Sequence, residues 1–159
     1  MKLRSAAPGD LDLLWDFLAM AAYEPDAAAA KAVPFVAAHL EGWKRPSDFG
    51  FIAEIDGKPV GAAWARHIPV EDNPFYIDDR SPVVSIAVQD GTRGKGVGET
   101  LLRTLIDEAA ARGLRLTLDV RETSPAKRLY ERLSFRRVPG QEVRNRVGSL
   151  SLGMAFGES

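Results

Sequence analysis

Residues 85–110 read SIAVQDGTRGKGVGETLLRTLIDEAA, and their patterns predict a strand, a glycine-rich loop and a helix in direct succession. The apolar run at 83–88 stops abruptly, and four glycines follow within the next ten residues. Apolar residues then recur at helical spacing until Gly113, a residue type that often ends a helix. A glycine-rich segment at the start of a helix, with Arg93 and Lys95 beside it, is typical of a phosphate-binding site, because the first N–H groups of a helix have no hydrogen-bond partners within the helix.

The loop also fits a plain connection between strand and helix, and two nucleotide-binding motifs can be tested against it. A Walker A loop needs serine or threonine after its Gly-Lys pair, but Gly96 follows Lys95, which excludes that motif. A dinucleotide fingerprint, G-x-G-x-x-G, begins correctly at Gly94 but has Glu99 in place of the third glycine. Asp119, near the end of the next expected strand, stands where such a site binds ribose. A dinucleotide-binding oxidoreductase therefore stays an alternative.

The composition of the whole chain narrows the class of protein. A chain of 159 residues with 45% hydrophobic and 27% charged residues is expected to form one globular domain over residues 1–159. The absence of cysteine excludes disulfides and a cysteine nucleophile, and with only two histidines no metal site is expected. A net charge of −1 gives no reason to expect nucleic acid or an anionic membrane as a partner. The first ten residues contain no apolar signal core, so the expected location is the cytoplasm.

Strand-like and helix-like patterns alternate along the chain. Asp56 and Gly57 separate two strand-like runs and predict a hairpin turn, while Pro34 predicts a break in a helical region. Ser124 followed by Pro125 predicts the start of the last helix. The order of expected strands and helices implies an α/β fold, with a mixed sheet and helices on both faces. The closing strand joins either its own sheet or the sheet of a partner in a homodimer. The expected strands are 2–6, 49–55, 59–68, 83–88, 114–120, 135–138 and 149–156, and the expected helices are 11–22, 26–42, 97–112 and 125–133.

Two signatures in this sequence resemble those of a known family. AVQDGTRGKGVGETLL, at 87–102, is similar to the acetyl-CoA-binding motif R/Q-x-x-G-x-G/A of the GNAT superfamily of N-acetyltransferases, matched by Arg93, Gly96 and Gly98. TSPAKRLYERLSF, at 123–135, resembles the second signature of the family, N-x-x-A-x-x-L-Y-x-x-x-G-F. The matching residues are Ala126, Leu129, Tyr130 and Phe135, whereas Thr123 replaces the Asn and Ser134 replaces the Gly. The opening, LRSAAPGDLDLLWDF, is similar to the first strand and helix of the family.

The resemblance implies a mostly antiparallel mixed sheet and an enzyme that moves an acetyl group from acetyl-CoA to an amine by direct attack. The strand before the loop would be splayed from its neighbour, with the pantetheine arm paired to the backbone of Ala87 and Val88. Backbone N–H near Val88 would also polarise the thioester carbonyl. Thr123 has a shorter side chain than the usual Asn, and its hydroxyl group would still reach the cofactor. The residues that would wrap the pyrophosphate are Arg93, Gly94, Lys95, Gly96, Val97, Gly98 and Glu99.

Tyr130 is a core residue by periodicity alone, and the resemblance implies that it is the general acid that protonates the leaving thiolate. Ordinary pKa values of about 10 for tyrosine and about 8.5 for a thiol make full proton transfer uphill by about 2 kcal/mol. A hydrogen bond that strengthens as the thiolate forms is therefore the better-supported role. Lys127 is either a contact to an adenine-side phosphate or a solvated surface lysine. The candidates for the base that deprotonates the amine are Glu54, Glu71, Asp78, Asp79, His67 and water.

The acceptor is open between a small amine, an amino acid, an antibiotic and a protein amine. The loop at 69–81, PVEDNPFYIDDRS, either attracts a cationic amine with its acids and offers Phe75 and Tyr76 as an aromatic wall, or is simply solvated. Three tryptophans, Trp15, Trp43 and Trp64, either line an acceptor pocket or fill the core. A non-catalytic acyl-CoA-binding protein is a further alternative, because the strand at 83–88 has no carboxylate and the second signature is altered at two positions.

Overall fold

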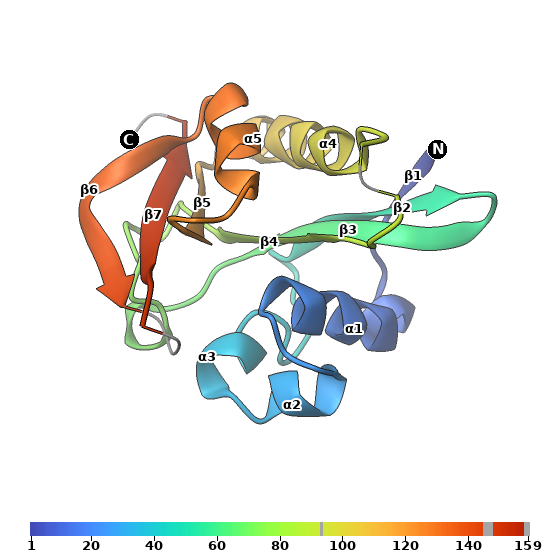
Figure 1. Ribbon diagram of the computed structural model, residues 1–159, viewed down its shortest axis with the longest axis horizontal. Helices are drawn as coiled ribbons and strands as arrows, with labels where there is room; N and C mark the ends of the chain where they lie inside the picture. The colour runs from blue at the N-terminus through green and yellow to red at the C-terminus, as the bar shows by residue number, and fades with distance from the viewer. Residues whose placement is uncertain (93, 145–147, 158–159) are drawn as a thin grey trace.

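The computed structural model describes residues 1–92, 94–144 and 148–157, in which one seven-stranded sheet separates two layers of helices (Figure 1). The strand order is β1-β2-β3-β4-β5-β7-β6, and neighbouring strands are antiparallel except for β4 and β5, which are parallel. This confirms the mixed, mostly antiparallel sheet expected from the sequence. The strands are β1 (Lys2–Ser5), β2 (Phe49–Ile55), β3 (Lys58–Arg66), β4 (Val83–Val88), β5 (Leu116–Arg121), β6 (Arg136–Arg144) and β7 (Leu150–Phe156).

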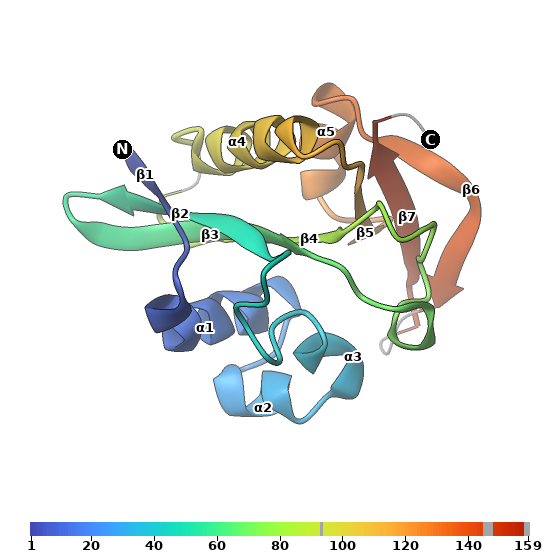
Figure 2. The ribbon, with the colours of Figure 1, turned by 180° about the vertical axis from the view of Figure 1, so that it is seen from behind.

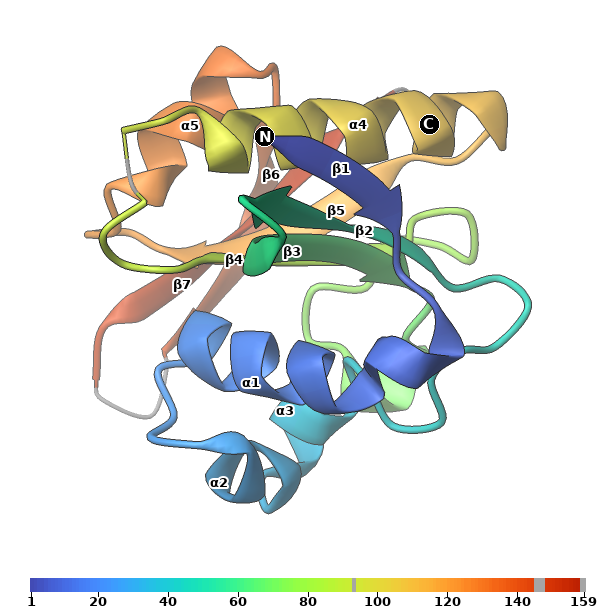
Figure 3. The same ribbon diagram turned by 90° about the vertical axis from the view of Figure 1, so that its right-hand side faces the viewer.

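Helices cover both faces of the sheet, as Figure 1 and the opposite view in Figure 2 show. Helices α4 (Val97–Ala111) and α5 (Ala126–Arg132) lie on one face, and α1 (Leu11–Ala21), α2 (Ala27–Lys31) and α3 (Pro34–Ala37) lie on the other. The end-on view in Figure 3 shows the sheet between these two layers. Each layer has its own apolar core, with Leu101 and Leu105 buried on the α4 side and Leu14 and Leu18 on the α1 side. Within the described ranges, no helix is long and apolar enough to cross a membrane.

Local sequence signals account for several boundaries between elements. Asp56 and Gly57 have φ values of 53° and 76°, the conformation that a two-residue hairpin turn of this type requires. Gly113, with a φ of 68°, follows the last turn of α4. Ala126 N–H donates to Ser124 Oγ at 3.2 Å where α5 begins. The predicted hairpin, helix end and helix start are therefore confirmed.

Two stretches differ from the expected elements. The helical region expected at 26–42 consists of two short helices, α2 and α3, and the residues after α3 form turns. Pro34 begins α3, so the expected break at this proline is confirmed. The strand expected at 135–138 is longer, because β6 pairs with β7 at both of its ends around an irregularity between Arg137 and Glu142. β7 lies between β5 and β6 of the same chain, so the closing strand joins its own sheet.

Candidate active site

Strands β4 and β5 are parallel neighbours that stay paired only where they begin. Val83 pairs with Thr117, and this is the only residue pair between the two strands in the described part of the chain. Thr117 N–H donates to Pro82 O at 3.0 Å at the same end. The strands therefore diverge toward their carboxyl ends and leave a gap in the middle of the sheet.

The register of β4 against β3 decides which main-chain groups face this gap. Gln89 N–H, just after β4, donates to Val60 O of β3 at 2.8 Å. Because bonded and non-bonded pairs alternate along an antiparallel ladder, Ala87 directs its main-chain groups toward β3, whereas Ile86 and Val88 direct theirs toward the gap. The predicted edge therefore shifts by one residue, with Ile86 in place of Ala87.

The glycine-rich loop after β4 opens helix α4 with N–H groups that have no helical partner. Gly94 and Gly96 have φ values of 84° and 75°, a left-handed conformation that glycine adopts without strain. Thr100 N–H donates to Gly96 O at 3.0 Å and makes the first bond of the helix, so the N–H groups of residues 97–99 precede the bonded turns. These groups lie at the positive end of the helix dipole and suit an anion.

The charged side chains near this loop have different surroundings. Arg93 lies outside the described residues, and Lys95 is exposed. The Glu99 carboxylate accepts a hydrogen bond of 2.6 Å from Arg132 of α5 and lies 3.5 Å from the guanidinium of Arg103. The hydrogen bond from Arg132 is the main reason that the pKa of Glu99 is lowered. The ionised side chain of Glu99 is thus paired with cations, and only its main-chain N–H suits a bound anion.

Tyr130 of α5 is buried on the α4 face of the sheet, only 7% exposed, with its ring centroid 6.0 Å from that of Phe135. Burial raises the pKa of Tyr130 above its ordinary value, and the charge of Asp119 and then Tyr23 raise it further. Tyr23 follows α1 in the opposite layer. The pKa of the Tyr130 hydroxyl group is therefore affected by groups on both sides of the sheet. Among the described residues this hydroxyl has no protein hydrogen-bond partner. It stays neutral at physiological pH and is free to donate to a ligand.

Asp119 of β5 is a carboxylate that borders the gap. Its neighbours Leu118 and Val120 are buried against the α4 layer, so the alternation of the strand turns Asp119 toward the α1 layer. The side chain is open to solvent, yet the protein that crowds its carboxyl group disfavours the charge and raises the pKa of Asp119.

The base candidates from the sequence do not lie on the strands that border the gap. Glu54 is on β2 and lies 3.3 Å from the guanidinium of Arg4. Asp78 accepts a hydrogen bond of 2.7 Å from the Ser81 hydroxyl, which belongs to the same loop. The other three are Glu71 and Asp79, in the loop at 69–81, and His67, which precedes it.

The aromatic candidates for an acceptor pocket are mostly core residues. Phe75 is 8% exposed, so the expectation of an aromatic wall is wrong for this residue. Gln141 of β6 donates hydrogen bonds of 3.2 Å to the carbonyl groups of Phe75 and Tyr76, which ties the loop at 69–81 to the sheet. All three tryptophans are buried, which confirms their interpretation as core.

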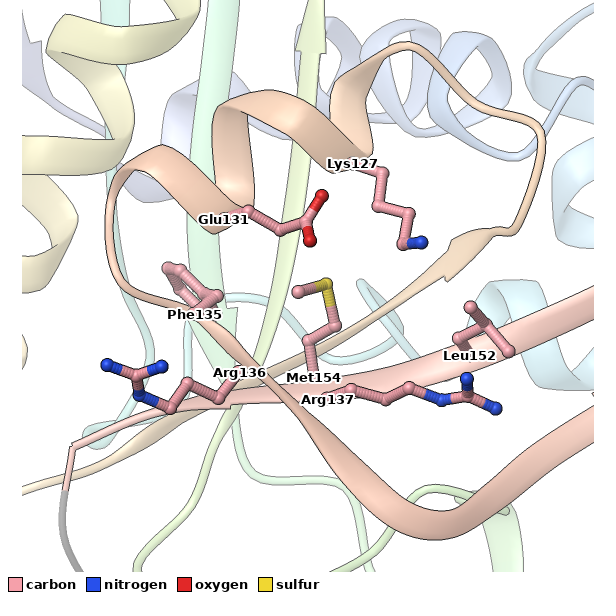
Figure 4. A pocket seen from close by; sticks show the side chains of 7 residues that line it. All are labelled: Lys127, Glu131, Phe135, Arg136, Arg137, Leu152 and Met154. Atoms are coloured by element: carbon pink, nitrogen blue, oxygen red, sulfur yellow. The ribbon is translucent and has the colours of Figure 1, made fainter.

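A cavity of about 240 Å³ lies between α5 and the β6–β7 pair (Figure 4). Lys127 and Glu131 point into it from one side of α5, whereas Arg132 lies on the side that contacts α4. Lys127 therefore faces away from the glycine-rich loop, which favours its interpretation as a surface lysine. Thr123 is exposed in the turn before α5. The cavity is lined by Lys127, Glu131, Phe135, Arg136, Arg137, Leu152 and Met154.

Comparison with known proteins identifies the family. Residues 12–135, most of the chain, match the model of the acetyltransferase (GNAT) family. The chain therefore belongs to the GNAT family of acetyltransferases, a class whose acetyl donor is acetyl-CoA. This confirms the class of enzyme predicted from the two signatures and disfavours the dinucleotide-binding oxidoreductase.

Solved structures support the same fold. A ribosomal-protein-alanine N-acetyltransferase from Brucella melitensis is 24% identical, with a TM-score of 0.71 over 98% of each chain. yncA from Salmonella typhimurium, solved with its cofactor acetyl-CoA, is 20% identical, with a TM-score of 0.73 over 100% of this chain and 95% of that one. An aminoglycoside 6'-N-acetyltransferase complexed with coenzyme A is 18% identical, with a TM-score of 0.67 over 98% of this chain and 96% of that one. At these identities the likeness establishes the fold alone, and a search of curated proteins finds no significant match.

Sequence reasoning missed two features beside the gap. The sequence pattern indicates Asp119 only as a ribose contact of a dinucleotide, and it does not indicate the hydrogen-bonded pair formed by Ser85 and His39. The available signal was a polar residue within an apolar strand, since Ser85 is the one polar residue of VVSIAV. Without the sheet register, that signal does not tell which polar residues meet.

Proposed function

We propose that this chain transfers the acetyl group of acetyl-CoA to an amine by direct attack, in the gap between β4 and β5. The observation that carries the proposal is that one continuous segment, residues 86–98, supplies both an unpaired strand edge and the open N-terminus of a helix. An extended amide-containing arm can pair with a strand edge, and a pyrophosphate can bind at a helix N-terminus. Acetyl-CoA contains both parts and supplies a thioester carbonyl carbon that a nucleophile can attack.

The proposed binding residues follow from the direction of the main-chain groups. Ile86 and Val88 would bind the pantetheine arm, with Val88 N–H polarising the carbonyl oxygen. The N–H groups of residues 94–99 would surround the pyrophosphate, with positive charge from Lys95 and, as expected from the sequence, Arg93. Thr123, in the exposed turn before α5, would contact the cofactor through its hydroxyl group.

Tyr130 would stabilise the leaving thiolate. Because burial raises the pKa of Tyr130, full proton transfer to a thiolate is more uphill than the ordinary values imply. The phenol would therefore act by donating a hydrogen bond that strengthens as negative charge develops on sulfur. The thiolate would then take its proton from solvent.

Thermal unfolding with excess acetyl-CoA, coenzyme A or NAD tests donor binding. A ligand at about 100 times its dissociation constant adds about 2.7 kcal/mol to the folded state, which raises Tm by about 5–11 °C for a domain of this size. We expect this shift with both coenzyme A compounds and none with NAD. A shift with NAD alone, or with none of the three, would contradict the proposed site.

Replacement of Tyr130 by Phe separates catalysis from binding. We expect Tyr130→Phe to lower kcat by about 10–100-fold, since one hydrogen bond to a charged group contributes about 1.5–3 kcal/mol. The Tm shift with acetyl-CoA should persist, because the phenol acts on the thiolate rather than on the bound donor. Unchanged kcat would assign Tyr130 to packing, and donor binding without turnover in the wild type would favour the non-catalytic acyl-CoA-binding alternative.

The remaining proposals concern organisation. Residues 1–159 would act as one domain, supported by a single seven-stranded sheet that extends from β1 to β6. The enzyme would be cytoplasmic, because acetyl-CoA is a metabolite of the cell interior. The acceptor would be an amine of a small molecule or protein, and a homodimer would have to form outside the β5–β7 pairing, which this chain completes by itself.

A further inference from the structure

Ser85 and His39 form a hydrogen-bonded pair on the α1 side of the gap. Ser85 Oγ lies 3.0 Å from His39 Nδ1, which joins β4 to the turn that follows α3. The backbone of His39 is held in turn, because Trp64 Nε1 donates to His39 O at 2.9 Å. Ser85 is only 7% exposed, and His39 is half-buried. A polar pair at this depth is held in a fixed orientation.

The protonation of His39 decides the direction of this hydrogen bond. Burial, and then the charge of Arg66, lower the pKa of His39 to about 4, so the ring is neutral at physiological pH. In the neutral tautomer with hydrogen on Nε2, Nδ1 is an acceptor and Ser85 Oγ donates to it. The lone pairs of Ser85 Oγ then remain for a donor that enters the gap.

Asp119 lies across the gap from Ser85. The last pair of the parallel strands is Val83 with Thr117, and Ser85 and Asp119 each come two residues later. Residues separated by two on a strand share a face, so both side chains turn toward the α1 layer. Ala87, on the face of Ser85, belongs to the apolar cluster of that layer. Ser85 and Asp119 are thus on the same face of the sheet, on the two strands that border the gap.

The charged and titratable groups that face Asp119 come from three elements. Arg121, on the same strand, places its guanidinium 3.9 Å from the ring centroid of Tyr23, which follows α1. Tyr130 of α5 lies in the other layer, and the charge of Asp119 raises its pKa. Within the described ranges, no ion pair neutralises Asp119, whose carboxylate accepts a hydrogen bond from its own main-chain N–H. The carboxylate is therefore available to a cationic or hydrogen-bond-donating ligand.

We propose that Ser85, oriented by His39, and Asp119 hold the nitrogen of a primary amine acceptor by its two N–H bonds. This inference rests on the proposed function and identifies the side chains that hold the acceptor nitrogen. A primary amine has two hydrogens and one lone pair, so two acceptors on opposite walls direct its lone pair toward the acetyl group. A secondary amine has a carbon in place of one hydrogen and leaves one of these acceptors unmatched.

The transfer balances with these groups. The amine lone pair forms the N–C bond at the thioester carbonyl, and the nitrogen gives one proton to the Asp119 carboxylate. The C–S bond then breaks, its electron pair stays on sulfur, and the Tyr130 hydroxyl donates a hydrogen bond to the thiolate. Asp119 returns its proton to solvent and the thiolate takes one, so the products are an N-acetyl amide and coenzyme A.

Steady-state kinetics with acetyl-CoA and two matched probe amines test the proposal. Glycinamide is a primary amine, and sarcosinamide is the same molecule with one N-methyl group. Release of coenzyme A can be followed with a thiol reagent without background from the enzyme, because the chain has no cysteine. The variants are Asp119→Asn, Ser85→Ala, His39→Asn and His39→Leu, with Asp107→Asn, an exposed residue of α4, as the control for charge.

We expect the wild type to use glycinamide at least about 10-fold better than sarcosinamide, and Asp119→Asn to lower kcat/KM for glycinamide by about 100-fold or more. Ser85→Ala and His39→Leu should lower it by about 10-fold and reduce the preference between the two amines. His39→Asn should restore most of the activity, because the Asn carbonyl oxygen can replace Nδ1 as an acceptor. Asp107→Asn should match the wild type.

The outcomes separate this inference from the proposed function. Absence of an acetyl-CoA-induced Tm shift in the wild type would refute donor binding itself. Two results would overturn the amine site and leave donor binding intact, provided that acetyl-CoA raises Tm as expected. One is wild-type activity in Asp119→Asn, and the other is a rate of coenzyme A release that glycinamide does not increase. Equal losses in His39→Asn and His39→Leu would refute the orienting role of His39.

Discussion

His39 makes the stability of the fold depend on pH in a range where few other groups contribute. The pKa of its imidazole falls from an ordinary value of 6.5 to about 4, first because of burial and second because of Arg66. The unfolded chain therefore binds a proton at a higher pH than the folded chain does. The contribution of His39 is fully present above pH 6.5, and it is lost as the pH falls toward 4.

The size of this effect follows from the two pKa values. Linkage gives a loss of about 2 kcal/mol in the free energy of unfolding between pH 7 and pH 5, and about 3 kcal/mol by pH 4. Three carboxyl groups, those of Asp10, Asp78 and Glu99, have lowered pKa values. Their contributions are lost mainly below pH 5. The raised pKa of Asp119 acts in the opposite direction but is present in both the wild type and a His39 variant, so the difference between these two proteins from pH 7 to pH 5 isolates the histidine.

Urea unfolding of the wild type and His39→Asn at pH 7, 6 and 5 measures this loss. Tryptophan fluorescence is a suitable signal, because Trp15, Trp43 and Trp64 are all buried. We expect the wild type to lose about 2 kcal/mol more than the variant between pH 7 and pH 5. His67 is present in both proteins, so its effect cancels. The same pH dependence in both proteins would refute a buried, neutral His39.

Three further predictions concern stability. Asp48→Ala removes the buried carboxylate that lies 2.7 Å from the guanidinium of Arg66. This should lower the free energy of unfolding in urea by about 3–5 kcal/mol. The control Glu71→Ala, at an exposed position, should lower it by less than about 0.5 kcal/mol. Gly96→Ala should destabilise the fold by about 1–2 kcal/mol, because the φ of Gly96 is 75°. Gly98→Ala should not destabilise it, since the added Cβ would contact Leu129 and Val88 at an ordinary 3.6 Å. Equal effects of the two substitutions would contradict the backbone argument. Asp119→Asn should raise Tm at pH 7, because the raised pKa means that ionisation destabilises the fold, and should leave Tm unchanged at pH 3, where both states are protonated. An unchanged Tm at pH 7 would show that the carboxylate is not crowded by protein.

The positions of the gap-lining residues explain why mutations in this enzyme should separate into two groups. Ile86, Val88 and residues 94–99 would act through main-chain groups, so side-chain replacement there changes binding only through backbone conformation. Ser85, Asp119 and Tyr130 would act through side chains that meet from two strands and a helix. Truncation of these side chains should change turnover while the fold is retained.

The sequence alone determined the local structure and the class of protein. Positive φ at Asp56 and Gly57, the start of α5 just after Ser124 and Pro125, and the glycine-rich opening of α4 all follow from residue types and spacing within a few positions. The two signatures likewise identified an acetyltransferase, because each is a continuous segment. The main-chain groups of the glycine-rich loop are predictable in this way, since one stretch of chain contains all of them.

Only the tertiary structure decided which side chains meet. Ser85 and Asp119 face each other because β4 and β5 are parallel, share one register and then diverge, and no pattern within either strand contains that pairing. His39 reaches Ser85 from 46 residues away, and the register with β3 exposes Ile86 rather than Ala87 to the gap. Interactions between distant segments depend on register and on layer, which are set when the whole sheet and its two helical layers pack together.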